Sequence, residues 1–292
     1  MIVKAHAKIN LGLAVGGTRP DGYHDISTVM QSVELFDTLV FQKREEPGLF
    51  FRCSEKNLPA DEGNLAYRAV KLLLGERLEK EGLILELEKN IPMAAGLAGG
   101  SADAAAALYG VNALFELGYS TEDLLREGKK LGADVPFCLV GGTCLCEGIG
   151  EILSEAAPLP PCYLVLAKPD AMVSTKEAYG SLLPVGEREE ISMEPVLRAL
   201  KEKNLAGLGL AMKNAFEEGV IAHHPEVGGL IRLLSEEGAL AARMSGSGPT
   251  VFGIFDDKER AEKARDAALR AYSLSACLVT GPSRAGLEGG AR

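Results

Sequence analysis

The sequence lacks the marks of several large protein classes. No apolar run among its 292 residues approaches the length of a membrane span, and its first eight residues lack the apolar core and cleavage site of a secretory signal. Basic residues are not in excess, since 31 lysines and arginines stand against 41 acidic residues, giving a net charge of −10. These absences argue against a membrane protein and against nucleic acid as the main partner. We therefore expect a cytoplasmic protein.

Cysteine and histidine patterns typical of disulfide or metal sites are also missing. The six cysteines include no CxxC pair, and the four histidines form no HExxH pattern. Four of the cysteines lie in apolar, strand-like surroundings, where a free thiol behaves as a small hydrophobe. His223 and His224 precede Pro225 at an expected helix start, and we interpret them as surface residues. The sequence thus predicts no disulfide framework and no transition-metal site built by the protein itself.

The most informative segment present is a glycine-dense turn, Pro92-Met-Ala-Ala-Gly-Leu-Ala-Gly-Gly-Ser101. It follows the alternating, strand-like segment 83–88 and leads into an alanine-rich run expected to form a helix over 101–115. Its glycines let the backbone approach a ligand, and N–H groups of the turn and the first helical turn can converge on anionic oxygens. The lysine and serine or threonine of the common nucleotide loop do not follow. The segment is typical of a polyphosphate site, and a closely packed turn is the alternative.

Two segments near the N-terminus carry polar residues. In Ala5-His-Ala-Lys-Ile-Asn-Leu11, strand alternation puts His6, Lys8 and Asn10 on one face. A lysine and an asparagine two residues apart can bind a phosphate and orient a hydroxyl together, although a solvated strand face would show the same pattern. Downstream, Asp21-Gly-Tyr-His24 lies in a turn and offers an aromatic ring beside an imidazole.

Two later segments are candidates for chemistry. In Gly132-Ala-Asp-Val-Pro-Phe137, we expect Pro136 to hold Val135 extended, so that Asp134 lies at a fixed elbow between a helix and a strand. A carboxylate held there could be a base or a metal ligand, or could only stabilise the turn. The segment Met244-Ser-Gly-Ser-Gly-Pro-Thr250 could bring backbone donors to a ligand, and a plain turn is the alternative.

Strand-like and helix-like patterns indicate an α+β protein. The chain is long enough for two modest domains, and the proline-dense segment 156–161 marks a candidate boundary. Ser120 or Thr121 is expected to cap a helix that ends at Gly132. The pattern predicts strands near 2–15, 28–42, 49–53, 83–89, 137–147, 162–167, 239–244, 250–255 and 274–279. It predicts helices near 64–80, 101–115, 120–131, 193–202, 205–218, 225–236 and 257–271, and a frayed tail from 281 to 292.

Taken together, these segments resemble the GHMP kinases, which phosphorylate small molecules such as galactose, homoserine and mevalonate. Three family blocks occur in order, namely Lys8-Ile-Asn10, the glycine turn and the 244–250 turn. The likeness spans nearly the whole chain and extends to the branch that phosphorylates 4-diphosphocytidyl-2-C-methyl-D-erythritol. The supporting strings are Ala7-Lys-Ile-Asn-Leu-Gly-Leu13, Arg19-Pro-Asp-Gly-Tyr-His24, Met30-Gln-Ser32, Ile91–Ser101 and Gly132–Phe137.

The resemblance implies a fold and a reaction. The fold would be a ribosomal-S5-like N-terminal domain over 1–156 and a ferredoxin-like C-terminal domain over 157–283, with the active site between them and a flexible tail over 284–292. The reaction would be ATP-dependent phosphorylation of the tertiary 2-hydroxyl of the methylerythritol moiety, in the non-mevalonate route to isoprenoid precursors. The resemblance implies Mg²⁺ and a substrate that carries a cytidine diphosphate group, and it allows a homodimer.

The resemblance also implies residue roles. Asp134 would be the general base on the hydroxyl, Lys8 its charged partner, and Asn10 a residue that orients the substrate. Tyr23 would pack on the cytidine ring, and His24 would hydrogen-bond the cytosine edge. The remaining implied contacts are Thr175 and an opposing aromatic wall at Tyr179 for the substrate, and Pro92, Met93, Ala94, Ala95, Gly96, Leu97, Ala98, Gly99, Gly100, Ser101 and Ala102 for ATP, with Ser101 a candidate Mg²⁺ contact.

The chain departs from the family pattern within the glycine turn. Ala94, Ala95 and Ala98 stand where some members carry glycine, and Ala102 stands where a second serine is frequent. Alanine permits a close backbone approach provided that φ stays negative. Two other functions remain open, namely a GHMP kinase for a smaller alcohol such as homoserine and a nucleotide-binding protein without catalysis. The presence of both Lys8 and Asp134 favours catalysis.

Overall fold

The computed structural model describes residues 1–182, 184, 186 and 189–290. In the first half of the chain the elements are β1 (Ile2–Thr18), β2 (His24–Arg44), β3 (Gly48–Cys53), α1 (Leu65–Leu74), the 3₁₀ helix η1 (Gly75–Glu79), β4 (Gly82–Glu88), α2 (Gly99–Leu114), α3 (Thr121–Leu131), α4 (Val135–Val140), β5 (Thr143–Glu147) and β6 (Ile152–Glu155). In the second half they are β7 (Tyr163–Pro169), α5 (Thr175–Gly180), α6 (Glu194–Lys201), α7 (Leu205–Ala211), α8 (Glu217–His223), α9 (Pro225–Glu236), β8 (Ala241–Met244), β9 (Val251–Phe255), α10 (Lys258–Ala271), β10 (Leu274–Thr280) and β11 (Leu287–Gly290).

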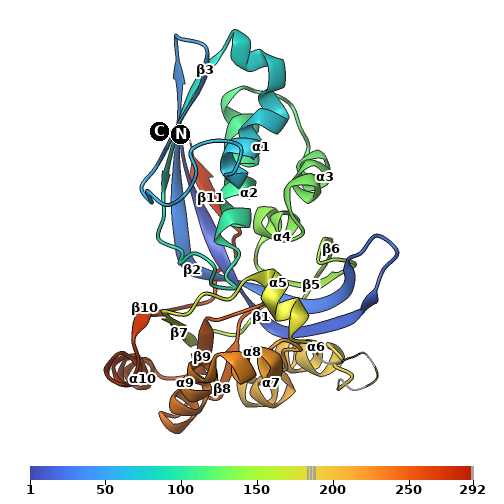
Figure 1. Ribbon diagram of the computed structural model, residues 1–292, viewed down its shortest axis with the longest axis vertical. Coiled ribbons are helices and arrows are strands. Elements are labelled where there is room, and N and C mark those ends of the chain that lie inside the picture. The colour runs from blue at the N-terminus through green and yellow to red at the C-terminus, as the bar shows by residue number, and fades with distance from the viewer. Residues whose placement is uncertain (183, 185, 187–188, 291–292) are drawn as a thin grey trace.

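The first sheet has the strand order β11-β1-β2-β4-β3, and β5 and β6 continue it from β2. Helices α1 to α4 lie on one side of this sheet, and the long β1–β2 hairpin extends beyond them (Figure 1). Helix α2 packs closely on β2, because a Cβ added at Gly110 would lie only 2.4 Å from Cζ of Phe41. The run of small residues in α2 therefore serves helix-to-sheet contact, which carries the glycine turn at the start of α2 to a fixed place on the sheet.

The second sheet has the strand order β10-β7-β9-β8, and every neighbouring pair is antiparallel. Helices lie between β7 and β8 and between β9 and β10 in the chain, so the unit has the split βαβ topology of ferredoxin-like domains. The α+β fold class and the ferredoxin-like second domain are thus confirmed. The chain passes from the first sheet to the second between β6 and β7, where the proline-dense segment lies.

β1 connects the two parts of the molecule. The N–H of Leu13 donates to the carbonyl of Lys213 at 2.9 Å, and the N–H of Ala215 donates to the carbonyl of Leu13 at 2.9 Å. The strand thus pairs with β2 of the first sheet along its length, while Leu13 in its second half also contacts the second domain. Since Lys8 and Asn10 lie just before this junction, the strand places them between the two domains.

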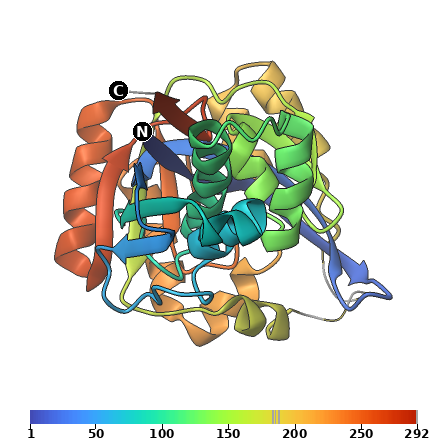
Figure 2. The same cartoon turned by 90° about the horizontal axis from the view of Figure 1, so that it is seen from above.

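The end of the chain returns to the first sheet, so the prediction of a flexible tail over 284–292 is wrong for its described part. β11 pairs with β1 in the register Ile2↔Gly290 to Ala5↔Leu287, so the last described residue lies beside the start of the chain (Figures 1 and 2). Glycine and serine are typical of frayed ends, but an open edge of β1 offered these residues a partner strand. Residues 291 and 292 lie outside the described part.

Three predicted elements are wrong in type or length. The segment 137–147 was expected to be one strand, whereas α4 occupies 135–140 and only β5 is extended. A short apolar run does not distinguish a buried helix from a strand, and Pro136 is tolerated in the first turn of a helix. The helix predicted near 205–218 ends at Ala211 as α7, with α8 starting only at Glu217, and the one near 64–80 ends as the 3₁₀ helix η1.

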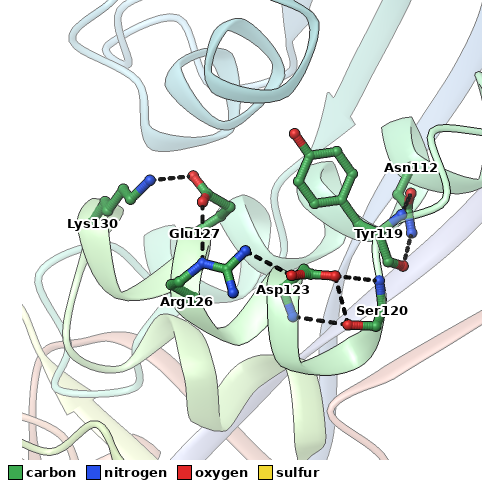
Figure 3. A network of polar contacts seen from close by, with 7 residues as sticks. All are labelled: Asn112, Tyr119, Ser120, Asp123, Arg126, Glu127 and Lys130. Carbon is green, nitrogen blue, oxygen red and sulfur yellow. Dashed lines mark hydrogen bonds and ion pairs between the residues drawn. The ribbon is translucent and has the colours of Figure 1, made fainter.

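Helix α3 begins as its sequence predicts. Ser120 is the N-cap, and it forms a reciprocal capping box with Asp123 (Figure 3). Hydrogen bonds from Ser120, and then the Arg126 guanidinium, lower the pKa of the Asp123 carboxyl to about 2. The helix ends at Leu131 with Gly132 as its C-cap, which fixes the start of the segment that carries Asp134. Within the described residues no helix has both the length and the apolar character to span a bilayer.

Candidate active site

A cavity of about 630 Å³ lies between the two domains. Its walls come from β1, the glycine turn and the Asp134 segment on one side, and from α5 and the 244–250 turn on the other. The residues predicted as a site that line it are Lys8, Asn10, Asp134, Thr175, Tyr179 and all of Pro92–Ser101. Segments far apart in the sequence therefore meet around one space large enough for small molecules.

Lys8 and Asp134 face each other in this cavity. Lys8 Nζ lies 3.7 Å from Asp134 Oδ2, and the lysine side chain is 5% exposed while the aspartate side chain is 31% exposed. Among the described residues, the Asp134 carboxylate makes no capping hydrogen bond to α4, although Asp134 is the N-cap residue. The carboxylate is therefore held near a cation while its oxygens stay open to a ligand in the cavity.

A chain of hydrogen bonds orients Lys8. Its Nζ donates to Asn10 Oδ1 at 2.7 Å, and Asn10 Nδ2 donates to Thr28 Oγ1 at 2.8 Å. Thr28 Oγ1 donates in turn to the carbonyl of Gly12 at 2.5 Å. Sequence reasoning missed Thr28, whose only signal was its place on β2, the strand that pairs with β1. Asn10 thus spans from the β2 strand to the lysine, which fixes the amine in a buried position.

The glycine turn is bound to β1 and to the second domain. Lys8 N–H donates to the carbonyl of Leu97 at 3.1 Å, and Ser245 Oγ donates to the carbonyl of Gly96 at 3.0 Å. Gly96 has φ of 71°, and a Cβ there would lie 2.1 Å from the carbonyl oxygen of Ser245. Gly246 also lies near the Lys8 amine, since a Cβ there would be 3.2 Å from Nζ. The 244–250 segment is therefore part of the site and not a plain turn.

The end of the glycine turn forms the N-terminus of α2. The helix begins at Gly99 after Ala98, which has a left-handed conformation with φ of 57°. The first N–H groups of a helix have no partner within it, so those of Gly99, Gly100 and Ser101 can bind anionic oxygens in the cavity. Ala102, by contrast, is fully buried inside the helix packing, and its side chain is not placed for a ligand.

The condition of negative φ, under which alanine can replace glycine in the turn, is not met at two of its alanines. Ala94 has φ of 46°, and Ala98 has φ of 57°. An L-residue pays roughly 1–2 kcal/mol for a left-handed backbone, which glycine avoids. The turn therefore keeps the shape that glycines would give it, because its contacts with β1 and Ser245 hold it there.

A second lysine site lies at the base of the turn. Lys89 donates to Asp103 Oδ2 at 2.6 Å and also to Asp37, and all three side chains are buried. Asp37 Oδ1 accepts the N–H groups of Asn90 and Ile91, at 2.5 and 2.8 Å. The trio thus joins the residues before the turn to the helix after it.

The titration of the trio follows from its burial. Burial would lower the pKa of Lys89, but Asp103 and Asp37 raise it above its ordinary value. Burial raises the pKa of the Asp103 carboxyl well above its usual range, because Lys89 only partly offsets the loss of solvent and the nearby Asp37 raises the pKa further. The sequence signal for this trio was the lone lysine between strand and glycine turn, which the pattern alone did not connect to Asp37 or Asp103.

Of the rings predicted to contact a cytidine, Tyr179 lines the cavity and His24 packs against Tyr179. The rings of His24 and Tyr179 stack with centroids 5.0 Å apart and planes 25° apart, and Tyr179 also meets Phe216 edge to face at 4.9 Å. Burial raises the pKa of the Tyr179 hydroxyl. Tyr23 lies on the β1–β2 turn and is 60% exposed. The structure thus brings His24 and Tyr179 together and leaves Tyr23 in solvent beside them.

Comparisons with known proteins agree on one family. The family model "GHMP kinases N terminal domain" matches residues 64–142, and "GHMP kinases C terminal" matches residues 196–274. The 4-diphosphocytidyl-2-C-methyl-D-erythritol kinase of Lachnoclostridium phytofermentans is 44% identical over 90% of this chain and 90% of its own length. The enzyme of the same name from Caldicellulosiruptor bescii is 42% identical over 96% of this chain and 98% of its own length.

Solved structures give the same result. A crystal structure of 4-(cytidine 5'-diphospho)-2C-methyl-D-erythritol kinase matches with a TM-score of 0.81 and 33% identity, over 99% of this chain and 100% of that one. A homoserine kinase from Cytophaga hutchinsonii has a TM-score of 0.79 at 21% identity, over 99% of this chain and 96% of that one, and shows the fold alone. The chain belongs to the GHMP family of small-molecule kinases, among the relatives named 4-diphosphocytidyl-2-C-methyl-D-erythritol kinase.

Proposed function

We propose that this kinase transfers the γ-phosphoryl group of ATP to the 2-hydroxyl of 4-diphosphocytidyl-2-C-methyl-D-erythritol. The observation that carries the proposal is the Lys8–Asp134 pair, 3.7 Å apart in a cavity whose wall is the glycine turn. The names of the relatives support the choice of substrate. The reaction is a step towards isoprenoid precursors by the non-mevalonate route, and we place the enzyme in the cytoplasm.

In this proposal Asp134 is the general base. Its partly exposed carboxylate can accept the proton of the substrate hydroxyl, and a positioned base typically contributes about 10²–10⁴-fold. Lys8 keeps the carboxylate ionised and stabilises negative charge on the transferred group. Asn10 holds the Lys8 amine in place through its 2.7 Å hydrogen bond. Phosphoryl transfer needs mainly alignment and charge neutralisation, which these three residues supply.

The glycine turn fits the phosphates of ATP. Its positive-φ positions and the first N–H groups of α2 line the cavity, where a side chain at Gly96 would collide with Ser245 and one at Gly246 would lie against Lys8 Nζ. Mg²⁺ also fits, because Ser101 and Asp134 offer oxygen ligands in the same cavity. When bound, Mg²⁺ would neutralise charge on the β- and γ-phosphate oxygens.

The stacked rings of His24 and Tyr179 form the proposed cytidine site. A flat aromatic pair with an imidazole can stack on a pyrimidine and hydrogen-bond its edge, and Thr175 lines the cavity beside it. Tyr23 would close on the ring from its exposed position on the β1–β2 turn. Homoserine has no ring to stack on these side chains, so the His24–Tyr179 pair would favour the cytidine-bearing substrate over homoserine.

The proposal is tested by ATP consumption with three acceptors: the diphosphocytidyl alcohol, the same alcohol phosphate without cytidine, and homoserine. Only the first should be phosphorylated efficiently, and Asp134→Asn should lower kcat for it by about 10²-fold or more. His24→Ala and Tyr23→Ala should mainly raise KM for the cytidine-bearing acceptor. Asp256→Asn, at an exposed aspartate after β9, is the control. Equal turnover of acceptors with and without cytidine contradicts the substrate, and an unaffected Asp134→Asn contradicts the base.

Assembly is a separate proposal. The family resemblance allows a homodimer, and an acidic chain with net charge −10 is a poor ligand for nucleic acid. Sedimentation of the full chain at several concentrations distinguishes monomer from dimer.

A further inference from the structure

A second polar cluster lies where β11 joins β1 and β2. β11 pairs with β1 so that Glu288 lies opposite Lys4, and the His6 N–H donates to the carbonyl of Gly286 at 2.9 Å. On the other side of β1 the register with β2 shifts between His6↔Phe36 and Lys8↔Ser32. Glu34 lies in this irregular part of β2, where extra residues re-aim a side chain. Three strands thus bring His6, Glu34 and Glu288 to one place.

The imidazole of His6 is held as metal-binding histidines usually are. Its side chain is fully buried, and Nδ1–H donates to the carbonyl of Val33 at 2.9 Å. Because a carbonyl only accepts, the neutral ring has its free lone pair on Nε2. Nε2 is buried and, among the described residues, has no hydrogen-bond partner. A buried acceptor without a partner is costly, which points to a ligand at this atom.

Two carboxylates converge on that nitrogen. Glu288 Oε1 lies 3.5 Å from His6 Nε2, and one ligand atom each of His6, Glu34 and Glu288 lie within 4.8 Å of one another. Both glutamates are exposed, so they can rotate to the metal–ligand distances of about 2.0–2.2 Å, and an ion can reach them from solvent. Lys4 lies 3.4 Å from Glu288 Oε2 and takes up part of the negative charge.

We propose that His6 Nε2, Glu34 and Glu288 bind one divalent transition-metal ion of the Zn²⁺ class, with water completing the coordination. An imidazole with two carboxylates suits such an ion better than Mg²⁺, which prefers oxygen ligands alone. The site clips the last strand of the chain to β1 and β2. It would overturn the sequence-based expectation of no transition-metal site, because its ligands come from three distant segments and form no short motif.

The site lies apart from the kinase reaction. The cavity is lined by Lys8 and Asn10 of β1, whereas His6 faces Phe36, with ring centroids 5.4 Å apart. The metal is therefore structural, and its loss should loosen β11 without removing the groups that act on substrate. Mg²⁺ supplied with ATP should not displace it.

The test is calorimetric titration of metal-free full chain with Zn²⁺, beside Glu34→Gln and Glu288→Gln. Loss of a supporting residue already costs a metal site about 10–100-fold in affinity, so each ligand variant should bind at least about 10-fold more weakly. Glu88→Gln, at an exposed glutamate at the end of β4, should bind as the unmodified chain does. Zn²⁺ at 100-fold over its Kd should raise the Tm by about 5 °C, and only in proteins that keep the site.

A second measurement locates the ion. Hydrogen exchange of the β11 amides should slow with Zn²⁺ in the unmodified chain and not in Glu288→Gln. Because both variant glutamates are exposed, their replacement leaves the core intact, and kinase activity should persist in each. Equal Zn²⁺ affinity in all four proteins would show that the ion is bound elsewhere, for example by thiols, and would overturn the proposal.

Discussion

Two lysine–carboxylate sites lie a short way apart in the first domain, and they differ in how completely they are closed. At Lys8 and Asp134 the charged atoms are 3.7 Å apart, and the aspartate side chain is 31% exposed. At Lys89 the amine donates to Asp37 and Asp103, and each of the three side chains is at most 7% exposed. Both sites line the same cavity, but the first pair keeps a partly exposed carboxylate towards it, whereas in the trio the Lys89 amine is shared by two buried carboxylates.

This difference separates catalysis from architecture. A buried ion pair is weak as a source of net stability, yet removing one partner is strongly destabilising because a charge is left unpaired. The Lys89 trio joins both ends of the glycine turn, so its loss should damage folding. In the Lys8–Asp134 pair, water or substrate can hydrogen-bond to the partly exposed carboxylate when the lysine is removed. Loss of this pair should therefore lower turnover more than stability.

The largest effect is expected for Lys89→Met. The change leaves Asp37 and Asp103 buried without a cation, and breaking a buried pair in this way costs about 3–5 kcal/mol of unfolding free energy. Urea unfolding measures it, and Lys71→Met, at an exposed lysine of α1, is the control. At saturating ATP, the change in kcat, expressed as a free energy, should be far smaller than the change in unfolding free energy. A Lys89→Met variant as stable as the unmodified chain would contradict the structural role of the trio.

Lys8→Met should have the opposite profile. Removing one preorganised charge-stabilising donor typically lowers kcat by about 10²–10³-fold. Stability should change by less than about 1 kcal/mol, because the partly exposed Asp134 regains water. Steady-state kinetics and urea unfolding of the same preparation give both numbers, with exposed Lys201→Met as the control. If unfolding is affected as much as turnover, the pair is structural after all.

The pH dependence of stability should reveal the trio. Because burial raises the pKa of Asp103 well above its usual value, the folded state keeps a proton that the unfolded state has released between the two pKa values. This group's contribution to stability therefore falls as pH rises through that interval, by at most about 1.4 kcal/mol per pH unit for one proton. Asp103→Asn removes the titration, so the stability of the variant relative to the unmodified chain should rise with pH above about 3.9, the ordinary pKa of an aspartate. If the stability of Asp103→Asn changed with pH in the same way as that of the unmodified chain, the raised pKa of Asp103 would be contradicted. Asp256→Asn is the control and should show the same pH dependence as the unmodified chain.

The smallest effect concerns the turn between the two sites. Ala98→Gly relieves a left-handed backbone conformation that costs roughly 1–2 kcal/mol for alanine. Glycine also gives the unfolded chain more conformational entropy, which lowers stability by roughly 0.5–1 kcal/mol. We expect a net gain of about 0.5–1 kcal/mol, measured as a Tm rise of about 2 °C. Ala95→Gly is the matched control, because Ala95 has no positive φ and should lose stability. A loss in both variants would show that the turn is not strained at Ala98.

Local patterns were reliable where the physics is local. The cap of α3 at Ser120 and the glycine turn before α2 depend on residues a few positions apart, and both are as the sequence predicts. The pattern failed at 137–147, where an apolar run allowed either helix or strand, and at the described part of the tail, where a distant strand edge decided the outcome. The positive φ values of Ala94 and Ala98 could not be predicted from the sequence either, because the contacts of the turn with Ser245 and β1 impose them.

The sequence by itself determined the α+β class, the glycine turn and the resemblance that proposed Lys8 and Asp134 as partners. Only the tertiary structure decided that these two side chains meet, that Lys89 binds Asp37 and Asp103, and that His6 faces Glu34 and Glu288. Propensity, capping and alternation act between near neighbours in the chain. Charges brought together from separate strands obey burial and pairing, and those depend on how the sheet and its helices pack.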